Sequence, residues 1–188
     1  AANADHAMAK FHLAGCYHDG IGVDKDQIKA IQLYRSLAEQ GIPRAQIALG
    51  QYYESGEGVD QDLNTAIDWY SKAADQGSDD GRLHIFWIGE CHYGGHGASQ
   101  DYEKAFEWYS KSANQGNSYG QWMVGVCFSN GEGVAKVDAK AIEWLCKSAE
   151  QGNRYGQDWL GDCYEEGWGV TKNIDTAVFW FRKSADQG

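Results

Sequence analysis

Apolar and small residues return along this chain at a nearly fixed interval. An apolar residue followed by a small one occurs at Leu13-Ala14, Leu49-Gly50, Ile88-Gly89, Val124-Gly125 and Leu160-Gly161. An aromatic or apolar pair follows twenty residues later, at Leu33-Tyr34, Trp69-Tyr70, Trp108-Tyr109, Trp144-Leu145 and Trp180-Phe181. The repeats span residues 6–41, 42–77, 78–116, 117–152 and 153–188, and each ends on Gln-Gly. A period in this range is typical of a solenoid, in which each repeat packs on its neighbours.

One repeat predicts one pair of helices. In residues 42–77, Pro43 suits a first helical turn, where its missing N–H is not needed. Leu49 and Tyr53 then fall on one face of a helix. Asp62 is placed to cap a second helix, and Gly77 is placed to end it. Five antiparallel pairs give an all-α fold of ten helices.

The other repeats predict the same caps, with two local differences. Residues equivalent to Asp62 are Asp26, Asp101 and Asn173. Repeat four has Val137 there and Asp138 next, so we expect its cap to move by one residue. Repeat three is three residues longer than the others. We expect the extra residues to extend or precede its first helix, with Asp79 or Asp80 as its cap and with the apolar phase of Ile85, Ile88 and His92 preserved.

These residues also carry a family resemblance. Residues 49–77 follow almost completely the pattern LGxxYxxGxGVxxDxxxAxxWYxKAAxxG, which resembles the Sel-one-like repeats (SLR), relatives of tetratricopeptide repeats. The resemblance covers essentially the whole chain. It implies a single domain over residues 1–188, a right-handed α-α superhelix with a concave surface lined by the first helices. It also implies a scaffold or adaptor that binds proteins or peptides and is not an enzyme. The chain could be a fragment of a longer array.

Charge and composition restrict the class of partner. The net charge of −11 opposes binding to nucleic acid or to anionic lipid, which needs clustered Lys and Arg. No apolar run approaches the length of a membrane span, so we expect a soluble protein. Both a cytoplasmic and a periplasmic or secreted location stay open.

Cysteine, histidine and glycine motifs offer few candidates for chemistry. Four cysteines share one repeat position, namely Cys16, Cys91, Cys127 and Cys163. Neighbouring copies would lie about 9–10 Å apart, beyond the Cα separation that a disulfide allows. The five Gly-x-Gly pairs lack the strand that precedes a phosphate-binding loop, so we interpret them as turns. We therefore predict free thiols and no cofactor or metal. The alternative is a zinc site built from Cys91, His92 and His96, for which no fourth ligand stands at a recognised spacing.

A surface for a partner can be mapped through the tetratricopeptide relatives, whose first helices line the concave face. Their exposed positions lie two before the apolar residue of each apolar-small pair, and two and five after it. Here they are Phe11, Gly15, His18, Ile47, Gln51, Glu54, Phe86, Glu90, Tyr93, Trp122, Val126, Ser129, Asp158, Asp162 and Glu165. All of these except Gly15, His18 and Ser129 are predicted partner-binding residues. Apolar side chains are frequent in the first four repeats, and repeat five is wholly acidic.

We therefore predict a groove for a protein or peptide with apolar anchors and some basic charge. Trp122 is its expected exposed anchor, whereas Trp69, Trp108, Trp144 and Trp180 share one repeat position and are expected in the core. The alternative is that the apolar groove residues pack against neighbouring second helices. Two other functions stay open, namely a metal- or thiol-dependent regulatory module and a structural spacer in a longer repeat array.

Overall fold

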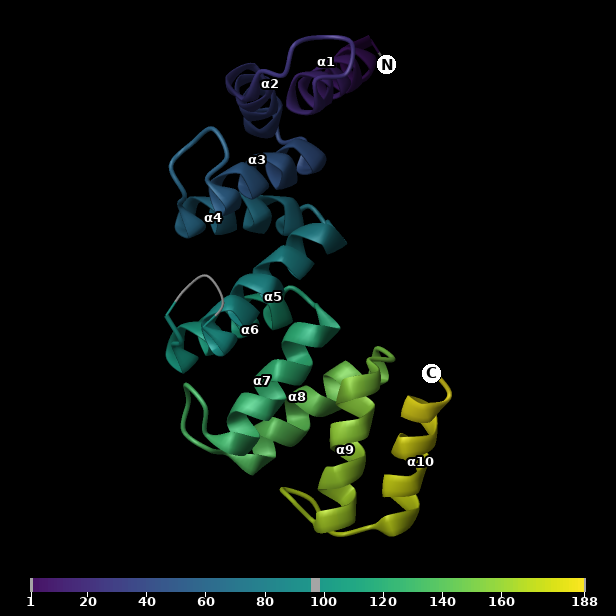
Figure 1. Cartoon of the computed structure of the whole chain (residues 1–188). Helices are drawn as coiled ribbons and strands as arrows, with labels where there is room; N and C mark the ends of the chain where they lie inside the picture. Colours follow the sequence, from purple (N-terminus) through teal and green to yellow (C-terminus); the bar gives the residue numbers. More distant parts are fainter. Residues whose placement is uncertain (1, 96–98, 188) are drawn as a thin grey trace. The chain divides into compact units, whose positions relative to one another are not determined.

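The computed structural model describes residues 2–95 and 99–187. Within these residues all regular structure is helical, and the ten helices confirm the predicted all-α fold (Figure 1). They are α1 (Ala2–Asp19), α2 (Gln27–Glu39), α3 (Pro43–Ser55), α4 (Leu63–Asp75), α5 (Asp79–Gly94), α6 (Tyr102–Asn114), α7 (Ser118–Asn130), α8 (Asp138–Glu150), α9 (Arg154–Glu166) and α10 (Ile174–Ala185). Odd-numbered helices are the first helices of the five repeats, and even-numbered helices are the second helices.

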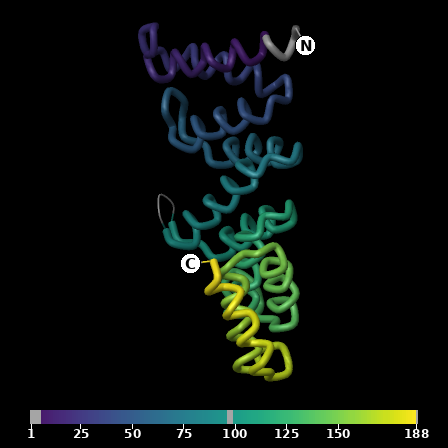
Figure 2. Tube along the Cα trace, turned by 90° about the vertical axis from the view of Figure 1, so that its right-hand side faces the viewer, coloured from purple at the N-terminus to yellow at the C-terminus, as the bar shows by residue number. Residues whose placement is uncertain are grey.

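The chain divides into two compact units, with the division inside α5. Unit 1 comprises Ala1–His84 and unit 2 comprises Ile85–Gly188. In unit 1, α2 packs against both α1 and α3, and α3 packs against α4. In unit 2, α7 packs against α6, α8 and α9, and α9 also packs against α8 and α10. Figure 2 shows the chain of unit 2 folding back and forth through these successive helices. A single array over residues 1–188 stays a prediction.

Within a repeat, the small residue of the first helix receives a ring or branched side chain of the second. A Cβ added at Gly50 would lie 2.5 Å from the ring of Tyr70, and one added at Gly125 would lie 2.7 Å from Leu145. Tyr70 and Leu145 are fully buried. The close approach explains why the apolar-small pair returns in every repeat, since a larger residue would separate the two helices.

The repeated tryptophans lie at the edge of the core rather than inside it, which corrects the sequence prediction. Trp69, Trp108, Trp144 and Trp180 are all half-buried. The residue three positions later is Lys in each repeat, and its ammonium group lies over the indole ring at 3.9 to 5.4 Å. This spacing places the two side chains on the same helix face, where a cation–π contact covers the outer side of the ring.

A chain of buried glutamine hydrogen bonds connects successive repeats inside each unit. In unit 1, Gln46 on α3 donates to the carbonyl oxygen of Ala38 at the end of α2 and accepts from Gln76 after α4. The corresponding sets in unit 2 are Gln121 with Ala113 and Gln151, and Gln157 with Ala149 and Gln187. Each buried amide thus finds a partner in a helix-end carbonyl, which also accepts a hydrogen bond from the backbone N–H of the glycine after the helix. The glutamine of the closing Gln-Gly motif therefore has a structural role that its recurrence alone does not specify.

The first helix of repeat three lacks this glutamine. Ile85 occupies the position equivalent to Gln46, Gln121 and Gln157, and its side chain cannot hydrogen-bond. The division between the two units falls at this residue.

The second helices begin as predicted in four repeats. Asp26, Asp62, Asp101 and Asn173 each accept a hydrogen bond from a backbone N–H of the first helical turn. The expected shift in repeat four is wrong, because α8 begins at Asp138 and Val137 occupies the cap position without a side-chain hydrogen bond. Asp138 instead lies in the first turn of α8, where its charge complements the helix dipole.

The three extra residues of repeat three extend its first helix, which confirms one of the two expected outcomes. Helix α5 has 16 residues, whereas the first helices α3, α7 and α9 have 13 each. The expected cap is wrong, because Asp79 and Asp80 lie inside the first turn and the backbone N–H of Gly81 donates to Ser78, the residue before the helix. Ile85 and Ile88 are fully buried, so the apolar phase continues through the longer helix.

In repeats two, four and five, the second glycine of the Gly-x-Gly turn lies against the second helix of the preceding repeat. Gly169 has a φ of +69° and lies so close to α8 that an added Cβ would be 2.8 Å from the carbonyl oxygen of Asp138. Gly133 has a φ of +71° and approaches the carbonyl of Tyr102 at the start of α6 still more closely. These positions therefore need glycine both for the left-handed backbone and for the space.

We expect Gly133→Ala to destabilise the protein more than Gly152→Ala. Both glycines have positive φ, so alanine costs about 1 kcal/mol at each for its backbone conformation. Only Gly133 has backbone atoms in the space of a Cβ, which adds about 1–3 kcal/mol of overpacking. Urea unfolding measures both free energies of unfolding, and equal losses would contradict the role assigned to the turn.

Candidate partner-binding surface

Aromatic side chains of successive first helices contact one another in unit 2. Trp122 of α7 stacks on Tyr155 of α9, with ring centroids 4.8 Å apart and planes inclined by 23°. Phe86 of α5 lies 5.8 Å from Tyr119 of α7 and 5.5 Å from Trp87. These separations are within the range for attractive aromatic pairs. We call Phe86, Trp87, Tyr119, Trp122 and Tyr155 the aromatic row.

Different members of the aromatic row are available to a partner than the sequence indicates. Trp87 is 52% exposed, Tyr119 42% and Tyr155 38%. Phe86 is only 4% exposed and packs with Tyr109 in the core of unit 2. Phe86 can therefore support the row from below but cannot be the direct anchor that the sequence predicts.

Burial also removes two other positions of α7 from the predicted groove. Val126 is buried, although the mapping from tetratricopeptide relatives places it on an exposed face. Ser129 is buried as well. The reason is that α7 packs against α6, α8 and α9, so that little of its circumference faces solvent.

Trp122 is half-buried rather than exposed, which corrects its expected role as a free anchor. Its indole packs against the apolar clusters of α7 and of α9, besides stacking on Tyr155. Its ring nitrogen is buried, and no hydrogen-bond partner for it is found among the residues that the structure describes. Trp122 therefore contributes to the packing of α7 on α9, and a partner can touch only part of it.

The predicted acidic positions of repeat five form a cluster on α9. Asp158 and Glu165 are exposed, and Asp162 between them is half-buried. Burial raises the pKa of Asp162, and the neighbouring charges of Asp158, Glu165 and Glu166 raise it further. The cluster thus repels its own charges, and a basic group brought to it would relieve that repulsion.

Three further predicted residues are already paired inside the protein. Tyr70 donates to Glu54 at 2.5 Å in unit 1, and Tyr109 donates to Glu90 at 2.5 Å in unit 2. Tyr93 donates to Glu132 at 3.0 Å. Glu54, Glu90 and Tyr93 therefore hold helices together through hydrogen bonds, and a partner would have to compete with these bonds.

The polar positions of unit 1 surround His84. Its ring stacks on Tyr70 at 4.4 Å, and its nitrogens lie 3.7 Å from a Glu54 oxygen and 3.4 Å from the Gln51 amide. Burial lowers the pKa of His84, although the nearby carboxylates oppose that effect. His18, another mapped position, bonds to the hydroxyl of Tyr52 at 2.6 Å.

The apolar positions of unit 1 are half-buried. Phe11 packs edge-on against Tyr34 with ring centroids 5.3 Å apart, and Ile47 is half-buried one repeat later. Gly15, another mapped position, is half-buried as well. Gln51 is exposed.

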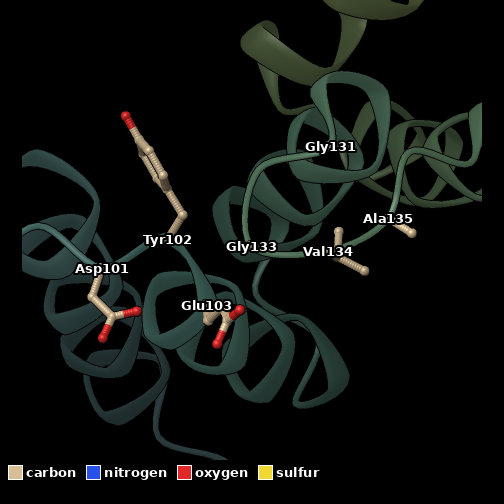
Figure 3. Close-up of a pocket in the computed structure, with 7 residues that line it drawn as sticks. All are labelled: Asp101, Tyr102, Glu103, Gly131, Gly133, Val134 and Ala135. Carbon is tan, nitrogen blue, oxygen red and sulfur yellow. The ribbon is translucent and has the colours of Figure 1, made fainter.

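A depression of about 630 Å³ lies beside the start of α6 in unit 2. Its lining residues are Asp101, Tyr102, Glu103, Gly131, Gly133, Val134 and Ala135. Figure 3 shows that the Tyr102 ring points away from the two carboxylates. Asp101 already caps α6, and Gly133 packs on the backbone of Tyr102. The depression therefore follows from the contact between the turn and the helix, and it offers an acidic rim to solvent.

The zinc alternative is only partly covered by the described residues. Across residues 2–95 and 99–187, no group of three or more His, Cys, Asp or Glu side chains could hold a metal ion. His96 lies outside the described residues. Cys91 and His92 are neighbours in α5, so their side chains point about 100° apart around the helix. All five cysteines are free of disulfides.

The family model for the Sel1 repeat matches residues 7–42, 43–78, 85–117, 118–153 and 154–188. The chain belongs to the Sel1 repeat family. The matched segments differ by one residue from most predicted repeat boundaries, and residues 79–84 fall between the second and third segments. Proteins of this family are generally scaffolds for protein interactions. The comparison with curated proteins finds no match.

Solved structures of Sel1 repeat proteins share the fold. A Sel1 repeat protein from Oxalobacter formigenes is 32% identical, with a TM-score of 0.70, covering 97% of this chain and 74% of that one. The protective antigen c5321 of uropathogenic Escherichia coli strains is 37% identical, with a TM-score of 0.71. This alignment covers all of the present chain but only 39% of c5321. The all-α solenoid predicted from the sequence is thus confirmed. No helix in the described part of the chain is long and apolar enough to cross a membrane.

The mapping of Sel1 repeat positions missed the two exposed tyrosines of the aromatic row. Tyr119 and Tyr155 stand five residues before the apolar residue of the apolar-small pair, a position held by Met8, Arg44 and Leu83 in the other repeats. Their recurrence in consecutive repeats was a usable signal. Trp87 also departs from the repeat pattern, but its exposure depends on how α5 packs.

We expect Trp122→Ala to destabilise this Sel1 repeat protein and Trp87→Ala to leave its stability nearly unchanged. Loss of the half-buried indole and its stacking should cost about 2 kcal/mol, less than for a fully buried tryptophan. A change at the largely exposed Trp87 should stay within about 0.5 kcal/mol. Thermal and urea unfolding of both variants measure the difference. A normal stability for Trp122→Ala would show that the stack is not structural.

We expect all five cysteines to react with a thiol reagent in denaturant without reductant, as free thiols do. In the folded protein, Cys127 and Cys163 should react slowest, because burial is the largest effect raising their pKa to about 12. At pH 8 the thiolate, which is the reactive form, is then only about one molecule in ten thousand. Mass spectrometry of partly labelled protein identifies the order, and fewer than four reactive thiols in denaturant would contradict the free-thiol assignment.

Proposed function

We propose that this protein is a non-enzymatic scaffold that binds a protein or peptide along the first helices of unit 2. The observation that carries the proposal is the aromatic row beside the acidic cluster of α9. Trp87 and Tyr119 present exposed rings that contact the buried Phe86, and the exposed ring of Tyr155 stacks on the half-buried Trp122. Rings held in this way bind at a low cost in conformational entropy, and for that reason Tyr and Trp are enriched at interfaces.

The negative charge beside the aromatic row favours a partner with basic residues. Asp158, Asp162 and Glu165 supply negative charge next to the aromatic row on the same helix as Tyr155. A peptide with apolar anchors and a basic segment would satisfy both parts of this surface. The basic segment would mainly speed association and make binding sensitive to salt. The net charge of −11 favours such a partner over nucleic acid.

Two alternative functions, a metal- or thiol-dependent module and a structural spacer, can each be tested by an experiment. The metal- or thiol-dependent module rests on Cys91, His92 and His96, and zinc analysis of the purified protein tests it. A structural spacer would be indifferent to changes in the exposed aromatic rings. We keep as a further proposal that residues 1–188 form one array that belongs to a longer one.

The test is a selection of displayed random peptides on the immobilised protein, followed by binding titrations of the selected peptides. Selected peptides should combine aromatic or aliphatic residues with Lys or Arg. Trp87→Ala should weaken their binding by about tenfold or more, which is the loss typical of an interface anchor. Trp168→Ala is the matched control, since Trp168 is 49% exposed but lies in the turn between α9 and α10.

Charge reversal at Asp158 and Asp162 should weaken binding of the same peptides, most strongly at low ionic strength, where screening is least. Association rates measured at two salt concentrations separate this effect from a loss of contacts. If Trp87→Ala and Trp168→Ala bind equally well, the aromatic row is not the recognition surface. If the selected peptides contain no Lys or Arg, the acidic cluster does not take part in recognition.

A further inference from the structure

One contact between neighbouring first helices recurs at a fixed separation in the sequence. Trp122 and Tyr155 are 33 residues apart, as are Phe86 and Tyr119, and both pairs bring rings together across a repeat boundary in unit 2. In unit 1 the equivalent pair between α1 and α3 is Phe11 and Arg44. This pair combines an aromatic ring with a cation instead of a second ring.

A pocket lies at this place in unit 1. It has a volume of about 230 Å³ and is lined by Ala7, Met8, Phe11, Ile42 and Arg44. A cavity of roughly 150 Å³ with an apolar lining is large enough to bind benzene. The pocket between α1 and α3 is therefore large enough for one aromatic side chain.

Ile42 makes one wall of this pocket apolar, but its side chain cannot cap helix α3. In α7 and α9 the equivalent residues are Asn117 and Asn153, and each accepts a hydrogen bond from the backbone of its helix. Ile42 occupies the cap position of α3 without any side-chain hydrogen bond. Asparagine is preferred at such positions, and the isoleucine instead packs against the buried core of unit 1 and gives the pocket an apolar wall.

Arg44 gives the pocket a charge. Its side chain is exposed and lines the pocket. A guanidinium group can lie over an aromatic ring and can also pair with a carboxylate. An apolar pocket with a cation on its rim thus complements a ring that has an anion beside it.

We propose that this pocket binds an aromatic side chain of an extended partner peptide that has an acidic residue two positions away. Residues two apart in an extended chain point to the same side, so that the ring can enter the pocket while the carboxylate meets Arg44. The bound ring would take a place beside Phe11 like that of Tyr155 beside Trp122. This site is independent of the proposed surface on unit 2, because it lies in the other unit and selects the opposite charge.

The test uses two peptides, Gly-Gly-Trp-Ser-Glu-Gly and Gly-Gly-Trp-Ser-Lys-Gly, both amidated at the C-terminus and acetylated at the N-terminus. Titration into nitrogen-15-labelled protein should shift the amide signals of Met8, Phe11 and Arg44 saturably. The Glu peptide should bind about threefold to fivefold more tightly than the Lys peptide, as expected for one solvent-exposed ion pair. No saturable shift at these residues with low millimolar Glu peptide would overturn the proposal.

Two variants separate the pocket from its charge. Phe11→Trp keeps Arg44 but fills the pocket with the residue that α7 has at this position, Trp122, so binding of both peptides should fall by about tenfold with the fold retained. Arg44→Glu should reverse the preference between the two peptides. Lys72→Glu changes the charge equally on α4, away from the pocket, and should leave the preference unchanged. An unchanged preference in Arg44→Glu, or unchanged binding in Phe11→Trp, would overturn the assignment.

Discussion

The buried glutamine in the first helix is the interaction on which the stacking of repeats inside each unit depends. An α-helix ends with carbonyl groups that have no partner of their own. Gln46, Gln121 and Gln157 each donate to a carbonyl at the end of the preceding second helix, beside the backbone N–H that this carbonyl already accepts, and each accepts from the glutamine that closes its own repeat. Three helices are thus linked at one buried point, where an unsatisfied polar group would be costly. The repeat that has Ile85 in place of this glutamine is also the repeat in which the chain divides into two units.

Once the repeats are linked, successive first helices inside a unit lie side by side, and their outer positions supply the side chains of the two proposed binding surfaces. Inside unit 2 this arrangement stacks Trp122 on Tyr155 and places Phe86 under Trp87 and Tyr119. Inside unit 1 the same positions are Phe11 and Arg44, and a pocket remains between them. One repeat geometry therefore produces a filled aromatic contact in one unit and an open apolar site in the other. The difference arises from the side chains at these two positions and from Ile42, which stands where α7 and α9 begin with asparagine. The proposed charge preferences are opposite because Arg44 borders the pocket of unit 1, whereas Asp158, Asp162 and Glu165 lie on α9 of unit 2.

Much of the structure follows from local rules that act within one repeat. The period, the capping residues Asp26, Asp62, Asp101 and Asn173, and the turn glycines predict the helices because they depend on backbone hydrogen bonds and dihedral angles close in sequence. The longer α5 is predictable for the same reason, since three residues are nearly one helical turn. The acidic cluster of repeat five could also be found from the sequence, because charged side chains on an outer helix face stay near solvent.

The sequence by itself determined the family, the five helix pairs and the sign of the charge on α9. Only the tertiary structure decided which residues a partner can reach. Phe86 and Val126 are buried because α5 and α7 are covered by neighbouring helices, whereas Trp87, next to Phe86, is exposed. The repeated tryptophans lie at the edge of the core. The residue after each of them, for example Tyr70 after Trp69, already packs against the small residue of the first helix. Helix periodicity defines faces to within about one residue, but exposure depends on how many neighbours a helix has, and that number is a property of the assembled fold.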